Sequence, residues 1–267
     1  MTTTVGIIGA GNMGSALARG LLLTKEAELR LTVYDKVAER SESLARAADG
    51  QVEVASSAPE LIRGAEVIIL SVKPQDLEAM LVELHPELGH EKTLVSVAAG
   101  LELERLRAAA GPEPVLFRLM PNLAVASGWG VVAVAHEAAT PSEAVGDLLT
   151  LLEGLGAVSV LPESQFDAVT AVAASGPAML ALVLEGLEDG GVGAGLPRSV
   201  ARLFVQQMAL GTARTLLDNS EAPAALKDRV TSPAGTTIAG LAVLEDRGVR
   251  GALLQAVRAA ERRAAEL

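Results

Sequence analysis

The feature that most constrains this chain is a short apolar run that leads directly into three spaced glycines. Residues 5–8 read Val-Gly-Ile-Ile and are followed by Gly9, Gly11 and Gly14. A strand joined to a helix by glycines at this spacing is typical of dinucleotide-binding folds. The first glycine permits the turn, the second lets a pyrophosphate approach bare backbone, and the third lets the helix pack close to the strand. The helix expected at Asn12–Leu23 would direct its positive end at phosphates.

The first 160 residues alternate β-rich runs with helical patterns. The predicted strands are Val5–Ile8, Arg30–Tyr34, Val52–Val54, Val67–Ser71, Thr93–Val97, Val115–Leu119, Gly130–Ala135 and Val158–Leu161. Helical patterns lie between most of the early strands, as at Lys36–Ala48 and Leu103–Ala110. This alternation predicts an α/β fold in which helices cover both faces of a doubly wound parallel sheet.

Strand signals stop near residue 162, so the sequence predicts a dinucleotide-binding domain over residues 1–162 and an all-helical domain over 163–267. The expected helices are Phe166–Asp189, Arg198–Asn219, Ala222–Val230, Thr237–Arg247 and Val249–Leu267. The stretches Ala178–Leu187 and Val200–Leu216 are apolar on most sides. A helix apolar all round must be buried all round, which predicts a helical homodimer interface. A compact monomeric bundle is the alternative.

Composition narrows the partners and the chemistry. The net charge is −11 over 267 residues, which argues against nucleic acid or an anionic membrane as the main partner. The apolar stretch Ala168–Leu184 is short for a membrane span and contains Ser-Gly-Pro. There is no cysteine, no basic leader pattern and no H-x-x-H motif. We therefore expect a cytoplasmic protein without a disulfide, signal peptide or metal site.

Two signals at the second predicted strand disagree about the cofactor. Asp35 ends this strand, where an acidic residue usually accepts hydrogen bonds from the adenosine ribose and disfavours a 2′-phosphate. Lys36 and Arg40 follow, and either could pair with such a phosphate. The sequence leaves the choice between NADH and NADPH open.

Three further segments follow predicted strands and so fall on the expected ligand edge. Val72-Lys73-Pro74-Gln75 could meet phosphate or ribose, or form a surface turn. The small residues of Ser96–Gly100 could leave room for a nicotinamide ring, or allow close packing. Asn122 could orient a ligand or cap a turn. None of His85, His90 and His136 has the setting of a strong base. A reaction that needs no strong protein base, such as hydride transfer to an electrophilic group, fits this sequence.

Two segments of the helical half could hold an anion. Ala174-Ser175-Gly176-Pro177-Ala178 either opens a helix with free amides or marks a kink. The segment Leu226–Ile238 carries turn-formers and hydroxyls between two helices, and Thr236 or Thr237 would N-cap the second. Such a loop could hold a carboxylate, or simply connect two helices.

These segments, in this order and spacing, resemble the pyrroline-5-carboxylate reductase family along essentially the whole chain. The glycine loop, Val72–Gln75, Ser96–Gly100, Met120–Asn122, Ser175–Ala178, Asp189–Val192, Gly195–Arg198 and Leu226–Ile238 carry the resemblance. It implies reduction of the C=N bond of 1-pyrroline-5-carboxylate by NADPH or NADH, giving L-proline in the last step of proline biosynthesis. It also implies interleaved helical domains, with substrate held between the nicotinamide and the partner subunit.

The resemblance assigns roles residue by residue. Ser232, Gly235 and Thr236 would hold the substrate carboxylate, and Thr237 would be the catalytic residue that hydrogen-bonds the ring nitrogen. With Asp35, the cofactor site would comprise Gly9, Gly11, Asn12, Met13, Gly14, Val72, Lys73, Pro74, Ala98 and Asn122.

The chain also departs from the family pattern at Leu123, Ala124, Ala173, Ala174, Met179, Arg229 and Ala234. Ala234 stands where a glycine is usual, and could restrict the turn. These departures leave two alternatives: a related two-domain dehydrogenase or imine reductase with another substrate, and a non-catalytic dinucleotide sensor. A β-hydroxyacid dehydrogenase would need a catalytic lysine, and none lies within Phe166–Asp189.

Overall fold

The computed structural model describes residues 2–24 and 28–266. It divides into two compact units, Met1–Ala174 with Glu261–Leu267, and Ser175–Ala260. The division falls later than the predicted boundary at residue 162. Phe166 explains this, because its ring is buried in the core of the first unit and keeps the start of the helical region there. Ala264, near the end of the chain, is also buried.

The described residues of the first unit form an eight-stranded sheet. Its strands are β1 (Thr2–Ile8), β2 (Glu28–Tyr34), β3 (Val52–Val54), β4 (Val67–Leu70), β5 (Thr93–Ser96), β6 (Val115–Pro121), β7 (Gly130–His136) and β8 (Gly156–Val160). The order β3-β2-β1-β4-β5-β6 is that of a doubly wound dinucleotide-binding domain, and β7 and β8 extend it. All the predicted strands are confirmed.

The prediction of a wholly parallel sheet is wrong at one pair of strands. β7 runs antiparallel to β6, and β8 then runs parallel to β7. Only the short 3-10 helix η2 (Leu123–Ser127) lies between β6 and β7. A parallel crossover needs a dozen or more residues, so this connection can only reverse the chain. The helix α6 (Ser142–Leu152) supplies the longer crossover to β8.

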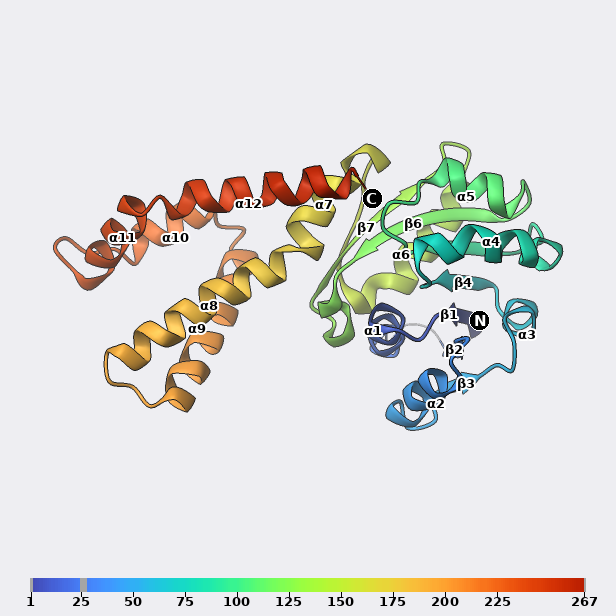
Figure 1. The fold of residues 1–267 in the computed structure, drawn as a ribbon, viewed down its shortest axis with the longest axis horizontal. Coiled ribbons are helices and arrows are strands. Elements are labelled where there is room, and N and C mark those ends of the chain that lie inside the picture. Colours follow the sequence, from blue (N-terminus) through green and yellow to red (C-terminus); the bar gives the residue numbers. More distant parts are fainter. Residues whose placement is uncertain (1, 25–27, 267) are drawn as a thin grey trace. The chain divides into compact units, whose positions relative to one another are not determined.

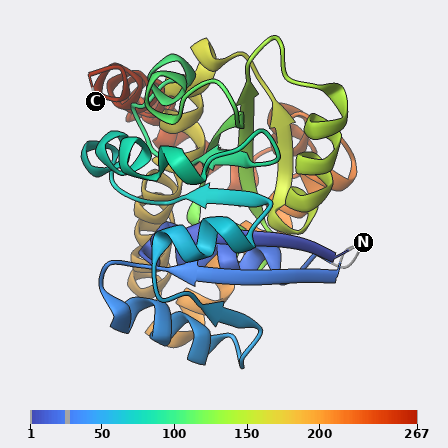
Figure 2. The same cartoon turned by 90° about the vertical axis from the view of Figure 1, so that its right-hand side faces the viewer.

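Helices cover both faces of the sheet because successive strand residues point to opposite sides. Ile7, Ile69 and Val95 pack against α1 (Asn12–Leu21), α2 (Ala38–Ala47) and α6. Their neighbours Ile8 and Leu70 pack on the other side, against α3 (Ala58–Gly64), α4 (Pro74–Leu84) and α5 (Leu103–Ala110). Figures 1 and 2 show these layers in two views of the first unit.

The second unit is helical, as the sequence predicts. Its helices are α8 (Gly176–Gly193), α9 (Arg198–Asp218), α10 (Pro223–Arg229), α11 (Thr236–Asp246) and most of α12 (Val249–Ala264). α8 and α9 pack against each other as a hairpin, and Gly195 adopts a φ of +101° in the turn. Glycine suits that turn because it has no Cβ to clash.

The long helix expected from Phe166 is interrupted rather than regular. It starts as α7 (Phe166–Val169), widens into a π-helical segment, η5 (Thr170–Ala174), and continues as α8. Ser175 keeps right-handed helical angles, with φ −89° and ψ −29°. A new helix nevertheless starts at Gly176, with Ser175 as an N-cap whose side chain makes no cap bond and with Pro177 in the first turn. The segment therefore opens a helix, and an anion site at residues 174–178 stays a prediction.

Almost nothing in the second unit is buried. Within Ser175–Ala260, all of which the structure describes, Ala201 alone is buried. Large apolar side chains are exposed along the helices, including Leu182, Leu203, Phe204 and Leu254. The stretch Glu163–Gly193 is long and apolar enough to cross a membrane by length and composition, and 11% of its most apolar window is buried. The second unit therefore does not bury its own apolar side chains, and it exposes more of them than is usual for a soluble protein unit.

Candidate functional site

The predicted cofactor residues of the first unit meet at the carboxyl edge of the sheet. The Gly9 N–H donates to the Tyr34 carbonyl at 2.7 Å, and the Ser71 N–H donates to the Ile8 carbonyl at 2.8 Å. The Val97 N–H donates to the Leu70 carbonyl at 3.2 Å. The ends of β1, β2, β4 and β5 are thus hydrogen-bonded side by side. Ligands of open α/β sheets bind at this edge.

Each glycine of the loop has the setting that its predicted task requires. Gly9 has φ +104°, and a Cβ there would lie 2.2 Å from the Ser71 carbonyl oxygen. A Cβ on Gly14 would lie 1.9 Å from the Gly9 carbonyl oxygen, so helix and loop are in close contact. A Cβ on Gly11 would meet nothing within 4 Å. The backbone at Gly11 is therefore open to an approaching group.

The N-terminus of α1 is free to bind an anion. Gly11 is its N-cap residue, no side chain caps it, and its first turn holds no acidic residue. Asn12, Met13 and Gly14 open the helix, so their N–H groups have no partner within it. Uncapped amides and the helix dipole favour a phosphate at this point. The loop therefore fits a dinucleotide pyrophosphate.

Asp35 holds the glycine loop in place. Its side chain is buried, and its two oxygens accept hydrogen bonds from the Ala10 and Val37 N–H groups, each at 2.8 Å. The Arg40 guanidinium lies 3.8 Å from one of these oxygens. Two amides and a cation thus already surround the carboxylate that the sequence assigns to the ribose.

Asn122 also makes bonds within the protein. Its amide nitrogen donates to the Ala173 carbonyl at 3.1 Å, and its side-chain oxygen accepts from the Val131 N–H at 3.3 Å. It thereby joins the β6–β7 turn to the π-helical segment η5. A π-helix leaves irregular carbonyls, and Asn122 satisfies one of them. Its assignment to the cofactor site stays a prediction.

The remaining predicted cofactor residues also lie at this edge. Lys73 is the exposed N-cap of α4, and Pro74 begins that helix. Val72 is partly buried against the core. Ala98 is buried just after β5, where its N–H lies 3.3 Å from the Ser96 hydroxyl oxygen. The structure thus groups the predicted cofactor residues in one unit.

The predicted substrate residues lie together in the second unit, in the loop from α10 to α11. The sequence prediction that Thr236 or Thr237 caps α11 is wrong: Gly235 is the N-cap, and no side chain caps the helix. Both threonines lie in the first turn, where their hydroxyls and uncapped amides share one end of the helix. Ser232 closes the loop, its carbonyl accepting from the Gly235 N–H at 3.1 Å. This arrangement fits a carboxylate.

The loop carries one strained residue, as its sequence suggests. Ala234 adopts φ +56°, in the left-handed region that glycine occupies freely. A non-glycine residue there costs about 1–2 kcal/mol. The observation agrees with the expectation that alanine restricts a turn of glycine type.

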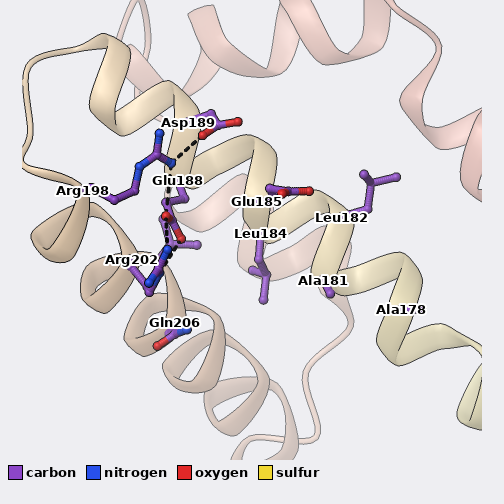
Figure 3. A pocket seen from close by; sticks show the side chains of 11 residues that line it. Ala178, Ala181, Leu182, Leu184, Glu185, Glu188, Asp189, Arg198, Arg202 and Gln206 are labelled. Carbon is purple, nitrogen blue, oxygen red and sulfur yellow. Dashed lines mark hydrogen bonds and ion pairs between the residues drawn. The ribbon is translucent and has the colours of Figure 1, made fainter.

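An ion-pair cluster ties α8 to α9 beside a groove of about 830 Å³. Arg198 and Arg202 reach from α9 to Glu188 on α8, with N–O distances of 3.1 Å, and Arg198 also contacts Asp189 (Figure 3). Hydrogen bonds from Arg202, then from Arg198, lower the pKa of Glu188. Sequence reasoning missed this cluster, although Glu188 and Arg202 lie on adjoining helical patterns.

A second contact missed by the sequence anchors the helical stretch in the first unit. Arg118, 4% exposed, pairs with Glu163 at 2.8 Å and lies over the Phe166 ring at 4.9 Å. Glu163 also accepts from the Leu103 N–H at 2.9 Å. Losing Glu163 would leave the buried Arg118 charge without its partner, so this contact helps to fix where α7 starts.

Other catalytic groups are scarce. Among the described residues no three His, Cys, Asp or Glu side chains gather as metal ligands. His136 bonds through Nδ1 to the Glu137 carbonyl and lies edge-on to Phe117. The first unit therefore offers an open glycine loop that suits a cofactor, and the second unit offers amides and hydroxyls that suit an anionic substrate.

Comparison with known proteins decides the family. A family model for pyrroline-5-carboxylate reductase dimerisation matches residues 163–267, and one for NADP oxidoreductase, coenzyme F420-dependent, matches residues 4–100. The chain is 39% identical to a Synechocystis pyrroline-5-carboxylate reductase over 100% of this chain and 99% of that one. This chain belongs to the pyrroline-5-carboxylate reductase family.

Other relatives agree over nearly the full length. A pyrroline-5-carboxylate reductase of Escherichia coli is 34% identical, covering 96% of this chain and 95% of its own. The Streptococcus pyogenes enzyme structure superposes with a TM-score of 0.87 at 32% identity, covering 100% and 99% of the two chains. The Plasmodium falciparum structure, solved with NADP bound, has a TM-score of 0.86 at 27% identity, covering 99% and 97%.

Proposed function

We propose that this chain reduces 1-pyrroline-5-carboxylate to L-proline with NADPH or NADH, the last step of proline biosynthesis. The observation that carries the proposal is the pair of uncapped helix N-termini, one at the open Gly11 backbone and one at Gly235. The first suits a dinucleotide pyrophosphate, and the second suits a small carboxylate. Full-length relatives that bear this enzyme name support the same activity.

A bound reduced nicotinamide would supply the hydride. The residues of this chain would bind and orient the cofactor and the substrate. The amides of Thr236 and Thr237 and the Ser232 hydroxyl would hold the carboxylate, and the Thr237 hydroxyl would form a hydrogen bond with the ring nitrogen. A protonated imine is electrophilic, so positioning and local electrostatics supply most of the catalysis. Solvent or a hydroxyl group would provide the proton.

The active form we propose is a cytoplasmic homodimer built through the second unit. The exposed apolar residues of α8, α9, α11 and α12 support it, as does the match to a dimerisation model over residues 163–267. A membrane is a poorer cover, because Glu188, Asp189, Arg198 and Arg202 form an ionic cluster beside these apolar surfaces.

The test is imine-dependent oxidation of NADPH and NADH, followed by the loss of reduced-nicotinamide absorbance, with wild type and Thr237→Ala. We expect turnover without added metal, and a fall of about 100-fold in kcat for Thr237→Ala, as for loss of one positioned hydrogen-bond donor. Thr237→Ser should recover much of the rate. Full activity in Thr237→Ala would contradict the role assigned to this residue. Dinucleotide binding without imine turnover in wild type would contradict the proposed function.

A further inference from the structure

A pocket beside the glycine loop bears on which dinucleotide this chain uses. It has a volume of about 370 Å³ and lies between α1 and the start of α2, within the first unit. Its lining includes Ala10 and Ser15 from the loop and α1, and Val37 and Ser43 from the second strand's end and α2. Two arginines, Arg19 and Arg40, also line it.

The position of this pocket matches the adenosine end of a dinucleotide. A pyrophosphate at the N-terminus of α1 directs the adenosine ribose toward the end of β2. The pocket begins at Ala10, whose N–H is bonded to Asp35, the residue that follows β2. A group attached to the ribose 2′-oxygen would therefore reach the pocket first.

The charges in the pocket favour an anion, despite one acidic neighbour. Arg19 and Arg40 are both exposed, and Glu39 is the acidic residue in the lining. Asp35 lies behind Arg40, buried, with both oxygens accepting backbone N–H groups. Arg40 lies 3.8 Å from Asp35 and lines the pocket, whereas Asp35 does not. Arginine binds phosphate strongly because its planar fork matches two phosphate oxygens.

Lys36, the other cation after β2, is directed elsewhere. Its ammonium pairs with Asp76 on α4 at 3.2 Å, and it does not line the pocket. The two basic residues that the sequence singles out after Asp35 therefore differ. Arg40 remains the cation best placed for a phosphate on the ribose.

We infer that this pocket receives the adenosine 2′-phosphate and that Arg40, aided by Arg19 and Ser15, makes this chain prefer NADPH to NADH. Asp35 then braces the glycine loop instead of selecting NADH. The inference deepens the proposed function and rests on it for the reaction, but binding of the dinucleotide can be measured without any imine.

The experiment measures Kd for NADP⁺ and NAD⁺ by calorimetry, and for 2′,5′-ADP against 5′-AMP, with wild type, Arg40→Ala and Arg40→Lys. Arg46→Ala is the matched control, because Arg46 lies on the same helix, pairs with Glu42 and does not line the pocket. We expect wild type to bind NADP⁺ at least about tenfold more tightly than NAD⁺. Arg40→Ala should raise the Kd for NADP⁺ and 2′,5′-ADP about tenfold and change the Kd for NAD⁺ and 5′-AMP by no more than about twofold.

Arg40→Lys should retain part of the preference, and Arg46→Ala should retain all of it. Equal wild-type affinity for NAD⁺ and NADP⁺ would overturn the inference, as would an Arg40→Ala variant that weakens both dinucleotides equally. A clear NADP⁺ preference in a protein that turns over no imine would uphold the pocket assignment and overturn the proposed reaction.

Discussion

Two helices of this protein have the same kind of uncapped N-terminus but differ in how much of each helix is buried. α1 begins at Gly11 and α11 begins at Gly235; neither is capped by a side chain, and neither has an acidic residue in its first turn. Leu17 and Ala18 of α1 are fully buried against the sheet. α11 has no buried residue. An anion site needs rigid support behind its amides. The first unit supplies that support for α1, whereas for α11 we propose that a second copy of the chain supplies it.

The largest effect on this comparison should come from disrupting the proposed dimer interface of the second unit. Phe204 on α9 is 60% exposed, and Phe204→Asp would place a charge in the proposed dimer interface. We expect a monomer by light scattering and a fall in turnover of at least about 100-fold, since the substrate loop loses its support. The control is Val82→Asp on α4, where Val82 is 64% exposed. A dimeric, active Phe204→Asp variant would contradict the account.

Within the first unit, two alanine substitutions separate binding from folding. Gly11→Ala adds a Cβ where no atom lies within 4 Å, so it should leave the Tm unchanged and weaken dinucleotide binding at least about tenfold by blocking the phosphate. Gly14→Ala adds a Cβ 1.9 Å from a backbone oxygen, so it should lower both the Tm and the affinity. Calorimetry and thermal melting measure both effects. Identical behaviour of the two variants would show that the glycines do not have distinct tasks.

Acid should weaken the second unit through Glu188. Arg202 and Arg198 hold the pKa of this carboxyl below its ordinary value of 4.5. A carboxyl with a lowered folded-state pKa contributes stability above its unfolded pKa and loses it as the pH falls through the folded one. Melting curves at pH 7 and pH 3 should therefore show a smaller acid-induced loss of Tm for Glu188→Gln than for wild type. Glu185→Gln changes an exposed carboxyl one turn before Glu188 on α8, and this variant should melt like wild type at both pH values.

The smallest expected effect lies in the substrate loop. Ala234→Gly relieves the left-handed backbone strain at φ +56°, which exceeds the entropy cost of glycine by about 1 kcal/mol or less. A gain of that size raises the Tm by at most about 2–4 °C in a protein of this length. Differential scanning calorimetry can resolve it. A lower Tm in the variant would show that the alanine methyl makes contacts that outweigh the strain.

The sequence predicts most of the fold because its signals are local. Strand β1, the glycine loop and helix α1 follow from residue spacing, and α9, α10 and α12 follow from helical periodicity to within a few residues. The antiparallel β7 was missed, although the short β6–β7 connection forces it. The π-helical break at Thr170–Ala174 depends on tertiary bonds such as the one from Asn122, which no local pattern carries.

The sequence predicts which positions belong to the site better than it predicts the hydrogen bonds and ion pairs that those residues make. Spacing places Asp35 beside the loop, but only the structure shows that its oxygens accept two backbone amides. The hydroxyls of Thr236 and Thr237 suggest a cap for α11, whereas Gly235 takes that place. The Arg118–Glu163 pair joins residues 45 apart in sequence, so no neighbouring residue indicates it.

The resemblance to the family implies, for the proposed dimer, that the substrate loop of one chain serves the glycine loop of the other. The most direct test is a heterodimer of Gly11→Ala and Thr237→Ala chains, co-expressed with two different tags and purified through both. Assayed at a dinucleotide concentration well below the wild-type Kd, each parent homodimer should show at most about a tenth of the wild-type turnover. Sites shared between chains give one site with both elements intact, so the heterodimer should show about half of the wild-type turnover per dimer. A heterodimer as inactive as its parents would show that each chain completes its own site, and would contradict the account.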